Sequence, residues 1–548
     1  MKLKIGFGKA ALLGIVCLSV AFCNTGSIKE VSAAANPGNS SAVPVSTQTE
    51  NSALYPIHDA NSSNDLYGFI DETGSVVIQP VYTRAENFSE GLAIVNQNDT
   101  CQVINTKGDI IFKSSNYVDN FHNGLAVFHD NKTFLSGYIN NKGKIAIKAS
   151  YTYAGDFGAD HTALVSKAGK FYRINSDGKI LKTYPLKTAN CYPVPGSNYV
   201  TYNDSKTFLT GVKDLNGKSI LKANYSEVTY LGNDLFGVKK KLPQEKGYLT
   251  NVEPYALFST SGKQLTPYKY YDLSSYSNHY ASYTDSKYTY LIDTKGSKVS
   301  SFPMQAGRGT LTVLGNVVQA NIDGSLYYLK MDGTLIWKAP EATKLSSDIT
   351  VHSVKVKPDK YVTVYYPRLE GLSDLNVQKK INDKLKSLFT ADRMTLTEKD
   401  ELMAEDNFSA NLLGDLLIIG KTGYDYPFGA AHGTPIRLYY FIDTKTGASY
   451  QFKDLFKKDS NYIKTLESIV LKKMKEQEKN GQGTYFSSDG GYVTENQFFD
   501  LSNDTLTIYF DSSSIAPYAA GFPEFKIPFS DIKNIINKDG AFWKSFHK

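Results

Sequence analysis

The feature that most constrains the fold is a unit of about 37 residues that recurs from Leu66 onward. Each copy places an apolar run before a tight turn, most often Asp/Asn-x-x-Gly, and a β-rich run after it, which is the pattern of a β-hairpin. Eight such turns end in Gly74, Gly108, Gly143, Gly178, Gly217, Gly262, Gly296 and Gly333. Periods of this length are typical of solenoids, propellers and repeat arrays.

These hairpins predict an all-β repeat domain over residues 66–340. A Phe-x-x-Gly-Leu-Ala-x-Val segment, first seen at residues 88–95, supplies a third strand per unit, and the spacing leaves room for a fourth. The seven intervals between the turns predict a seven-bladed β-propeller, in which residues 328–337 complete the first sheet. Closing the ring would protect the sheet edges that an open array of hairpins, the alternative architecture, leaves exposed.

The pattern changes near Pro340, and residues 346–548 predict an α+β domain, so the chain is multidomain. We expect a helix after Ser373 or Asp374, both favourable N-cap residues, because apolar residues follow at spacings of three and four. We expect a second amphipathic helix after Asp459 and Ser460, with a Lys/Glu-rich outer face. Strand-like runs surround both helices.

The N-terminus predicts export. Residues 1–35 combine a basic start, an apolar run over residues 10–22 and a small-residue stretch that ends at Ala35, which is the layout of a secretory signal peptide. The apolar run is too short to span a bilayer, and no later segment matches it, so we expect no membrane span. Lipidation of Cys23 is the alternative, although Phe22 is large for the position before a lipidated cysteine. Residues 36–65 are rich in Ser, Asn and Pro and predict a disordered linker.

Charge and cysteine content exclude several classes of protein. The formal net charge of +6 in 548 residues is too small and too scattered to predict nucleic-acid binding. Only Cys101 and Cys191 follow the signal segment, so neither a disulfide scaffold nor a zinc site is expected. Low cysteine content, many lysines and a long signal favour a Gram-positive bacterium. The sequence contains no nucleophile elbow, phosphate loop or metal motif, which predicts no catalytic residues, no metal and no cofactor.

The repeats resemble a known family. Residues 67–74 read Tyr-Gly-Phe-Ile-Asp-Glu-Thr-Gly, and Val-Ile-x-Pro and Phe-x-Glu-Gly-Leu-Ala-x-Val segments follow. This unit resembles the WG repeat, a bacterial β-repeat, with Tyr67 in place of the eponymous tryptophan. The match is good over residues 66–170 and continues to about residue 340 through the period of the turns.

The C-terminal half resembles a second family. The segments at residues 366–372, 429–433 and 515–521 occur in the order of landmarks in a domain of unknown function from Gram-positive extracellular proteins. The family includes the extracellular domain of an anti-sigma factor that senses lysozyme and a non-catalytic part of a peptidoglycan deacetylase. The resemblance implies recognition of a muramidase-like protein or of peptidoglycan.

Four residues are candidate ligand-binding residues, because aromatic and histidine side chains on strand-connecting loops can anchor a partner. They are Tyr426, Phe428, His432 and Tyr518. The alternative interpretation is that His432 fixes its own loop by hydrogen bonds to the backbone while the aromatic rings cover the core.

The expected function is therefore that of a secreted, non-enzymatic binding protein of the Gram-positive cell envelope, extracellular or associated with the wall. Its partner would be an extracellular protein or peptidoglycan, bound through the C-terminal domain. A wall-modifying enzyme whose site is not visible in the sequence is the alternative, and paired carboxylates deep in a cleft would favour it.

Overall fold

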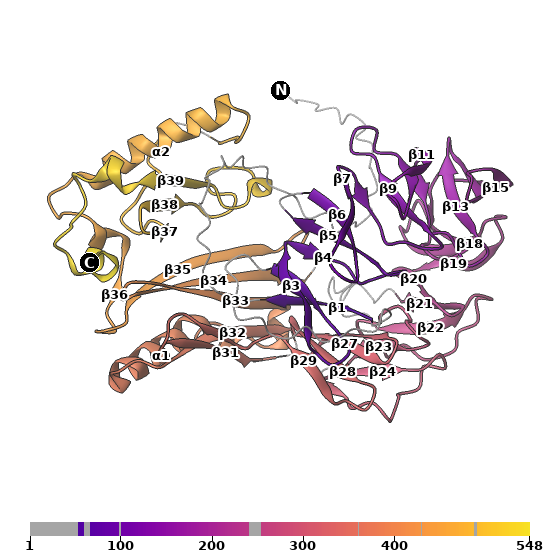
Figure 1. Cartoon of the computed structure of the whole chain (residues 1–548), viewed down its shortest axis with the longest axis horizontal. Coiled ribbons are helices and arrows are strands. Elements are labelled where there is room, and N and C mark those ends of the chain that lie inside the picture. Colours follow the sequence, from indigo (N-terminus) through magenta and orange to yellow (C-terminus); the bar gives the residue numbers. More distant parts are fainter. Residues whose placement is uncertain are drawn as a thin grey trace, which may run out of the picture. The chain divides into compact units, whose positions relative to one another are not determined.

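The computed structural model describes residues 53–59, 66–97, 100–240, 254–285, 287–359, 361–428, 430–486 and 490–547. The predicted signal peptide and most of the predicted linker lie outside these residues. The described chain is mainly β, with a repeat region of small antiparallel sheets followed by a C-terminal domain (Figure 1). No helix among the described residues is both long and apolar enough to cross a membrane.

The repeat region forms eight antiparallel sheets of three or four strands within the described residues. The first sheet contains β1 (Tyr55–Asp59), β2 (Leu66–Ile70) and β3 (Val76–Tyr82), and the second contains β4 (Arg84–Ala85), β5 (Leu92–Gln97), β6 (Thr100–Asn105) and β7 (Ile110–Ser114). The third contains β8 (Tyr117–Val118), β9 (Leu125–His129), β10 (Ser136–Asn140) and β11 (Ile145–Tyr151), and the fourth contains β12 (Tyr153–Ala154), β13 (Thr162–Lys167), β14 (Lys170–Asn175) and β15 (Ile180–Lys187). The fifth sheet contains β16 (Cys191–Pro193), β17 (Tyr199–Asn203), β18 (Thr210–Asp214) and β19 (Ser219–Tyr225), and the sixth contains β20 (Glu227–Gly232), β21 (Leu235–Lys239) and β22 (Tyr255–Ser259). The seventh contains β23 (Ala281–Thr284), β24 (Tyr288–Ile292) and β25 (Gln305–Ala306), and the eighth contains β26 (Gly309–Leu314), β27 (Val317–Ile322), β28 (Ser325–Lys330) and β29 (Leu335–Lys338).

The turns that defined the repeat occur once in each sheet, and their chemistry is local. In the first, one carboxylate oxygen of Asp71 accepts hydrogen bonds from the backbone N–H groups of Thr73 at 2.8 Å and Ser75 at 3.0 Å. Gly74 closes the turn at a φ of +87°, a conformation that a side chain disfavours. The same Asx geometry recurs at Asn105 and Asn140. The four-residue Asp/Asn-x-x-Gly motif therefore forms the same turn in each of these three sheets.

Neighbouring sheets pack by a repeated contact. The turn glycine of one sheet lies against the last strand of the preceding sheet, as Gly178 does against Ile147 and Gly262 against the carbonyl oxygen of Ile220. Gly74 of the first sheet lies in the same way against the carbonyl oxygen of Ile336 in β29 of the eighth sheet. The first and last sheets also share a cluster of buried apolar side chains.

Two predictions for this region are wrong in detail. Residues 328–337 do not complete the first sheet; they contain the second half of β28 and most of β29 of an eighth sheet, so eight sheets replace the predicted seven. The first sheet instead takes β1 from the segment predicted to be a linker, where Tyr55 and Ile57 are buried. Burial of these two side chains, in a segment otherwise rich in Ser, Asn and Pro, holds β1 in place.

The C-terminal domain contains a seven-stranded sheet and a three-stranded sheet. The larger sheet comprises β30 (Ala342–Lys344), β31 (Thr350–Val356), β32 (Val362–Glu370), β33 (Leu402–Leu413), β34 (Leu416–Pro427), β35 (Thr434–Asp443) and β36 (Ser449–Tyr450) in that order. The smaller comprises β37 (Phe499–Leu501), β38 (Thr505–Tyr509) and β39 (Glu524–Pro528). Within the described residues of this domain, β32 and β33 are the only strands that pair in parallel, across the connection that contains the first helix.

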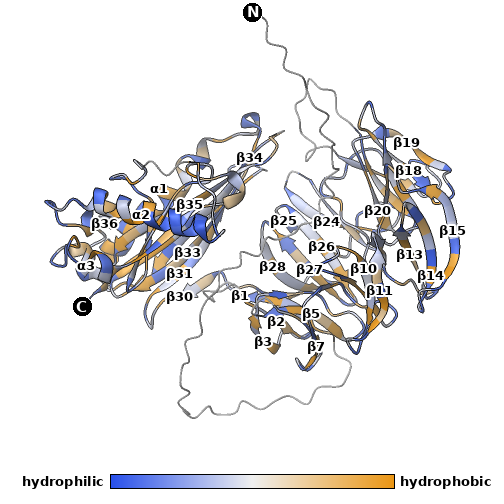
Figure 2. Cartoon of the chain, turned by 90° about the horizontal axis from the view of Figure 1, so that it is seen from above, coloured by the Kyte–Doolittle hydropathy of each residue, from blue (hydrophilic) through white to orange (hydrophobic). Residues whose placement is uncertain are grey.

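Both expected helices are present in this domain. The carboxylate of Asp374 caps α1 (Leu375–Thr390), which buries Ile381, Leu385 and Phe389 against the larger sheet. Helix α2 (Tyr462–Lys479) buries Leu466, Val470 and Met474 in a second core with the smaller sheet and leaves a hydrophilic face visible in Figure 2. Short helices complete the domain: η2 (Arg393–Thr395), η3 (Glu398–Asp400), η4 (Phe452–Leu455), η5 (Tyr518–Ala520), η6 (Phe529–Ile532) and α3 (Ala541–Phe546).

Candidate functional site

A cleft of about 310 Å³ in the C-terminal domain has the composition of a ligand-binding site. Aromatic side chains form much of its lining, and polar side chains stand among them, which is the usual make-up of a concave binding site. The lining residues are Lys384, Leu388, Tyr439, Tyr440, Phe441, Ser449, Tyr450, Gln451, Phe452, Glu495, Asn496, Gln497 and Phe499.

The cleft exists because strand β36 is short. Two residues of β36 pair with Phe441 and Ile442, and the preceding part of β35 has no strand neighbour on that side among the described residues. Tyr439 and Tyr440 therefore lie on an open sheet edge. Helix α1 supplies Lys384 and Leu388, while residues 495–499 approach from the other half of the domain.

The ionisation of the lining residues is simple. Burial raises the pKa of Tyr439 and Tyr440. Burial also raises the pKa of Tyr450 to about 12, helped by the hydrogen bond that its hydroxyl donates to Asp443 at 3.0 Å. These phenols are therefore neutral near pH 7, and the charged lining residues are the exposed Lys384 and Glu495. The lining therefore presents aromatic surfaces, hydrogen-bonding groups and two charged side chains of opposite sign.

Two of the four residues predicted from the sequence meet in the structure. The ring of His432 stacks on the ring of Tyr518 with centroids 4.0 Å apart. The Tyr518 hydroxyl donates to the carbonyl oxygen of Gly433 at 3.0 Å, and the Tyr424 hydroxyl accepts from the Gly433 N–H at 2.8 Å. Nδ1 of His432 lies 3.0 Å from that same carbonyl oxygen. These are the contacts expected if His432 fixes its own loop.

Tyr426 and Phe428 lie where β34 ends and do not join that pair. The Tyr426 hydroxyl donates to the carbonyl oxygen of Ala430 at 3.0 Å. The Phe428 ring packs edge-on against Tyr361, with centroids 4.9 Å apart. None of the four predicted residues lines the cleft. Ligand binding by the four therefore stays a prediction.

A buried ion cluster holds the strands that carry this loop. The guanidinium of Arg393 donates to both carboxylate oxygens of Asp406 at 2.8 Å and to Asp425 at 2.6 and 3.1 Å. Lys421 Nζ lies 3.1 Å from Asp406, whose side chain is fully buried. Burial opposes the charge on Arg393, but its hydrogen bonds to the two carboxylates raise its pKa. The cluster fixes β33 and β34 at the base of the loop.

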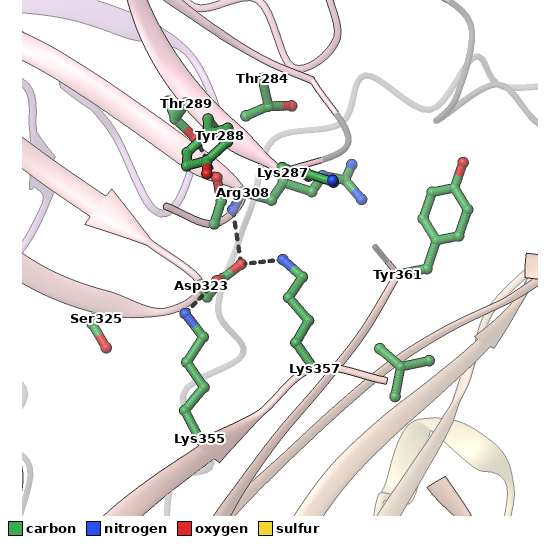
Figure 3. A network of polar contacts seen from close by, with 12 residues as sticks. Thr284, Lys287, Tyr288, Thr289, Arg308, Asp323, Ser325, Lys355, Lys357 and Tyr361 are labelled. Carbon is green, nitrogen blue, oxygen red and sulfur yellow. Dashed lines mark hydrogen bonds and ion pairs between the residues drawn. The ribbon is translucent and has the colours of Figure 1, made fainter. Parts of the chain in front are cut away.

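A second cavity, of about 330 Å³, lies at the junction of the repeat region and the C-terminal domain. Asp323, between β27 and β28, accepts from the backbone N–H of Arg308 at 2.9 Å and pairs with Lys355 and with Lys357 at 2.8 Å (Figure 3). The lysines belong to the C-terminal domain, and so does Tyr365, whose hydroxyl donates to the Asp323 carbonyl oxygen at 2.5 Å. These contacts tie the two domains together.

Sequence reasoning missed the cleft. A Tyr-Tyr pair in β35 was its one local signal, while Lys384 and residues 495–497 join the site only through tertiary packing. Among the described residues, no group of three or more His, Cys, Asp or Glu side chains is placed to hold a metal ion.

Comparison with known proteins finds one family model that matches within the repeat region and one that matches within the C-terminal domain. The family model "WG containing repeat" matches residues 67–101 and 137–171, and the model "Protein of unknown function (DUF3298)" matches residues 453–530. No curated protein matches.

Among solved structures, a DUF3298 family member from Bacteroides fragilis shares 18% sequence identity, with a TM-score of 0.27, and covers 36% of this chain and 97% of its own. A DUF3298 family protein from Pseudomonas aeruginosa shares 17% identity, with a TM-score of 0.26, and covers 35% of this chain and 97% of its own. The two family models thus find WG-type repeats in the N-terminal region and a DUF3298 segment at the C-terminus.

Proposed function

We propose that this chain is a secreted, non-enzymatic binding protein of the Gram-positive cell envelope. In this proposal the C-terminal domain binds a muramidase-like protein or a fragment of peptidoglycan in the cleft beside β35. The observation that carries it is the composition of that cleft, in which Tyr439, Tyr440 and Tyr450 stand beside amide side chains.

The chemistry of the cleft supports a saccharide or peptide ligand. Aromatic faces pack against the apolar faces of sugar rings or side chains, and the amides of Gln451 and Asn496 can pair with N-acetyl, hydroxyl or peptide groups. Lys384 offers a charge for a carboxylate, and Glu495 offers one for an amine. The open edge of β35 could also pair with an extended peptide, because its outward backbone groups lack a strand neighbour among the described residues.

We also propose that the eight sheets close into a ring, as an eight-bladed propeller. The contact between Gly74 and the Ile336 carbonyl oxygen supports this, because the consecutive fifth and sixth sheets make the same contact through Gly262 and Ile220. A closed ring would be a stiff platform for the C-terminal domain and would leave no long exposed sheet edge.

Calorimetric titration of the mature chain with lysozyme and with soluble muropeptides tests the proposed function. We expect saturable binding to one of the two probes, without release of muropeptides from purified walls in a parallel assay. Failure to bind either probe would contradict the proposal, and release of muropeptides would favour a wall-modifying enzyme instead.

A further inference from the structure

Two hairpins of the repeat region share one sequence pattern that the turn glycines do not explain. Residues 130–137 and 204–211 both read Asp-x-Lys-Thr-Phe-Leu-Ser/Thr-Gly. The first hairpin joins β9 to β10 and the second joins β17 to β18, so both connect the second and third strands of a four-stranded sheet. The two sheets are the third and the fifth, with one sheet between them.

Both hairpins use their aspartate to build the loop. Asp130 Oδ1 accepts from the backbone N–H groups of Lys132 at 2.9 Å and Thr133 at 2.8 Å. Asp204 Oδ1 accepts from the corresponding N–H groups of Lys206 at 3.0 Å and Thr207 at 2.8 Å. The carboxylates thus face the loop backbone, and Lys132 and Lys206 are exposed at the two tips.

The phenylalanines at these tips work against stability. Phe134 has a φ of +57° and an 87% exposed side chain, and Phe208 has a φ of +56° and a 70% exposed side chain. A left-handed backbone favours glycine or asparagine, and an exposed ring contributes no burial to folding. The same two unfavourable features, a left-handed backbone and an exposed ring, occur at equivalent positions of two sheets. This indicates that the phenylalanines serve binding rather than folding.

The sheet between them adds positive charge at the same end. Lys167 pairs across the β13–β14 hairpin with Lys170, and Lys170 pairs in turn with Lys187 of β15. All three side chains are exposed, and like charges directly opposite each other destabilise a sheet. Over the described residues, no ion pair links these lysines to a carboxylate.

Successive sheets place these hairpin ends on one side. Gly178 of the fourth sheet packs on Ile147 of the third, and Gly217 of the fifth packs on Leu186 of the fourth. Because one contact relates each sheet to the next, the hairpins that join second to third strands lie at corresponding ends. We call the exposed lysine and phenylalanine side chains at these ends the Phe–Lys rim. It consists of Lys132, Phe134, Lys167, Lys170, Lys187, Lys206 and Phe208.

We propose that the Phe–Lys rim docks the repeat domain on the surface of an anionic lipid bilayer. The rings of Phe134 and Phe208 insert at the boundary between headgroups and acyl chains, and the lysines between and beside them contact anionic headgroups. Apolar tips flanked by lysine suit this boundary, because the ring leaves water while the ammonium groups stay at the charged surface.

A bilayer fits this rim better than a protein partner does. A protein hot spot usually lies at the centre of a contiguous packed patch, whereas each phenylalanine here stands on its own loop with a whole sheet between the two. A soluble polyanion would use the lysines but would have no place for the exposed rings. The inference is independent of the cleft and of its ligand.

Co-sedimentation of the full mature chain with vesicles tests the rim. The probes are phosphatidylcholine vesicles with and without about 30% phosphatidylglycerol. We expect the chain to partition onto the anionic vesicles. Salt should weaken this partitioning, because it screens the attraction between the lysines and the anionic headgroups. The double variant Phe134→Gly/Phe208→Gly should lower the partition coefficient at least about tenfold. Its thermal midpoint should not fall, because glycine relieves the left-handed strain.

A matched control distinguishes insertion of the rim from nonspecific adsorption of any exposed aromatic side chain. Phe486 is 62% exposed on the C-terminal domain, outside the rim, and Phe486→Ala should leave partitioning unchanged. The wild-type chain staying in the supernatant, or the double variant sedimenting like wild type, would overturn the proposal. Binding to soluble polyphosphate as strong as to the vesicles, with no loss in the double variant, would assign the lysines to a polyanion and also overturn it.

Discussion

The hydroxyl of Tyr328 in β28 donates a 2.6 Å hydrogen bond to the carbonyl oxygen of Pro56 in β1, which lies 272 positions earlier in the chain. The Tyr328 side chain is fully buried, and burial raises its pKa. Its ring also lies 5.6 Å from that of Tyr55. One side chain therefore links the first and last sheets of the repeat region.

Replacing Tyr328 with phenylalanine tests this link. Tyr328→Phe keeps the ring but leaves the Pro56 carbonyl oxygen without this donor inside the protein, and we expect a loss of about 1–3 kcal/mol in the free energy of unfolding. Urea denaturation measures it. Tyr55→Phe is the matched control, because the Tyr55 hydroxyl donates a long hydrogen bond of 3.4 Å to the carbonyl oxygen of Leu314. Its removal should lower the free energy of unfolding by less than about 1 kcal/mol. Equal losses in the two variants would contradict a special role for Tyr328.

The buried cluster around Arg393 should dominate the local stability of β33 and β34. Arg393→Ala leaves Asp406 and Asp425 without their main partner, and we expect a loss of about 3–5 kcal/mol. Arg393→Lys keeps the charge but cannot bind both carboxylates through a planar fork, so its loss should be smaller and still measurable. Denaturation curves of the two variants check this order. A loss below about 1 kcal/mol for Arg393→Ala would contradict the assignment.

The junction between the domains should weaken in acid. Burial alone would raise the pKa of Asp323, but hydrogen bonds from Lys355, Lys357 and the Arg308 backbone outweigh it and lower that pKa below its usual value. A carboxyl group with a lowered pKa stabilises the folded state above its usual pKa, and this contribution disappears as the pH falls through the lowered value.

The matching experiment compares the thermal midpoints of wild type and Asp323→Asn. The wild-type protein should be more stable at about pH 7, and the difference should shrink toward about pH 3 as the carboxyl group becomes protonated. A difference that does not change with pH would show that the ion pairs with Lys355 and Lys357 contribute nothing to the junction.

Local chemistry explains which parts of the fold were predictable. The turns at Gly74 and its equivalents form through hydrogen bonds within four residues, and the N-cap Asp374 acts within the first turn of α1, so short windows of sequence predict them. Strand β1 was missed because Tyr55 and Ile57 stand in a polar segment and are held by pairing with β2 and by the eighth sheet. The number of sheets depended on that strand.

The candidate site was less predictable than the fold. The clustering of glycine and aromatic residues around His432 predicted a ligand-binding loop. In the structure, the side chain of His432 contacts mainly other parts of the same domain. The cleft draws Lys384 from α1, Tyr439 from β35 and Asn496 from a later loop, so no short window contains it. Sites assembled from separate elements become visible only once the packing is known.

The most direct test of the proposed function is a titration that compares two variants of the mature chain. Lys384→Ala/Asn496→Ala removes two exposed side chains from the cleft lining, and Lys475→Ala removes an exposed lysine of α2 outside the cleft. For whichever of lysozyme or soluble muropeptide binds the wild-type chain, we predict that the cleft variant weakens binding at least about tenfold, or 1.4 kcal/mol, while Lys475→Ala leaves it unchanged. Wild-type affinity in the cleft variant would contradict the assignment of ligand binding to this cleft.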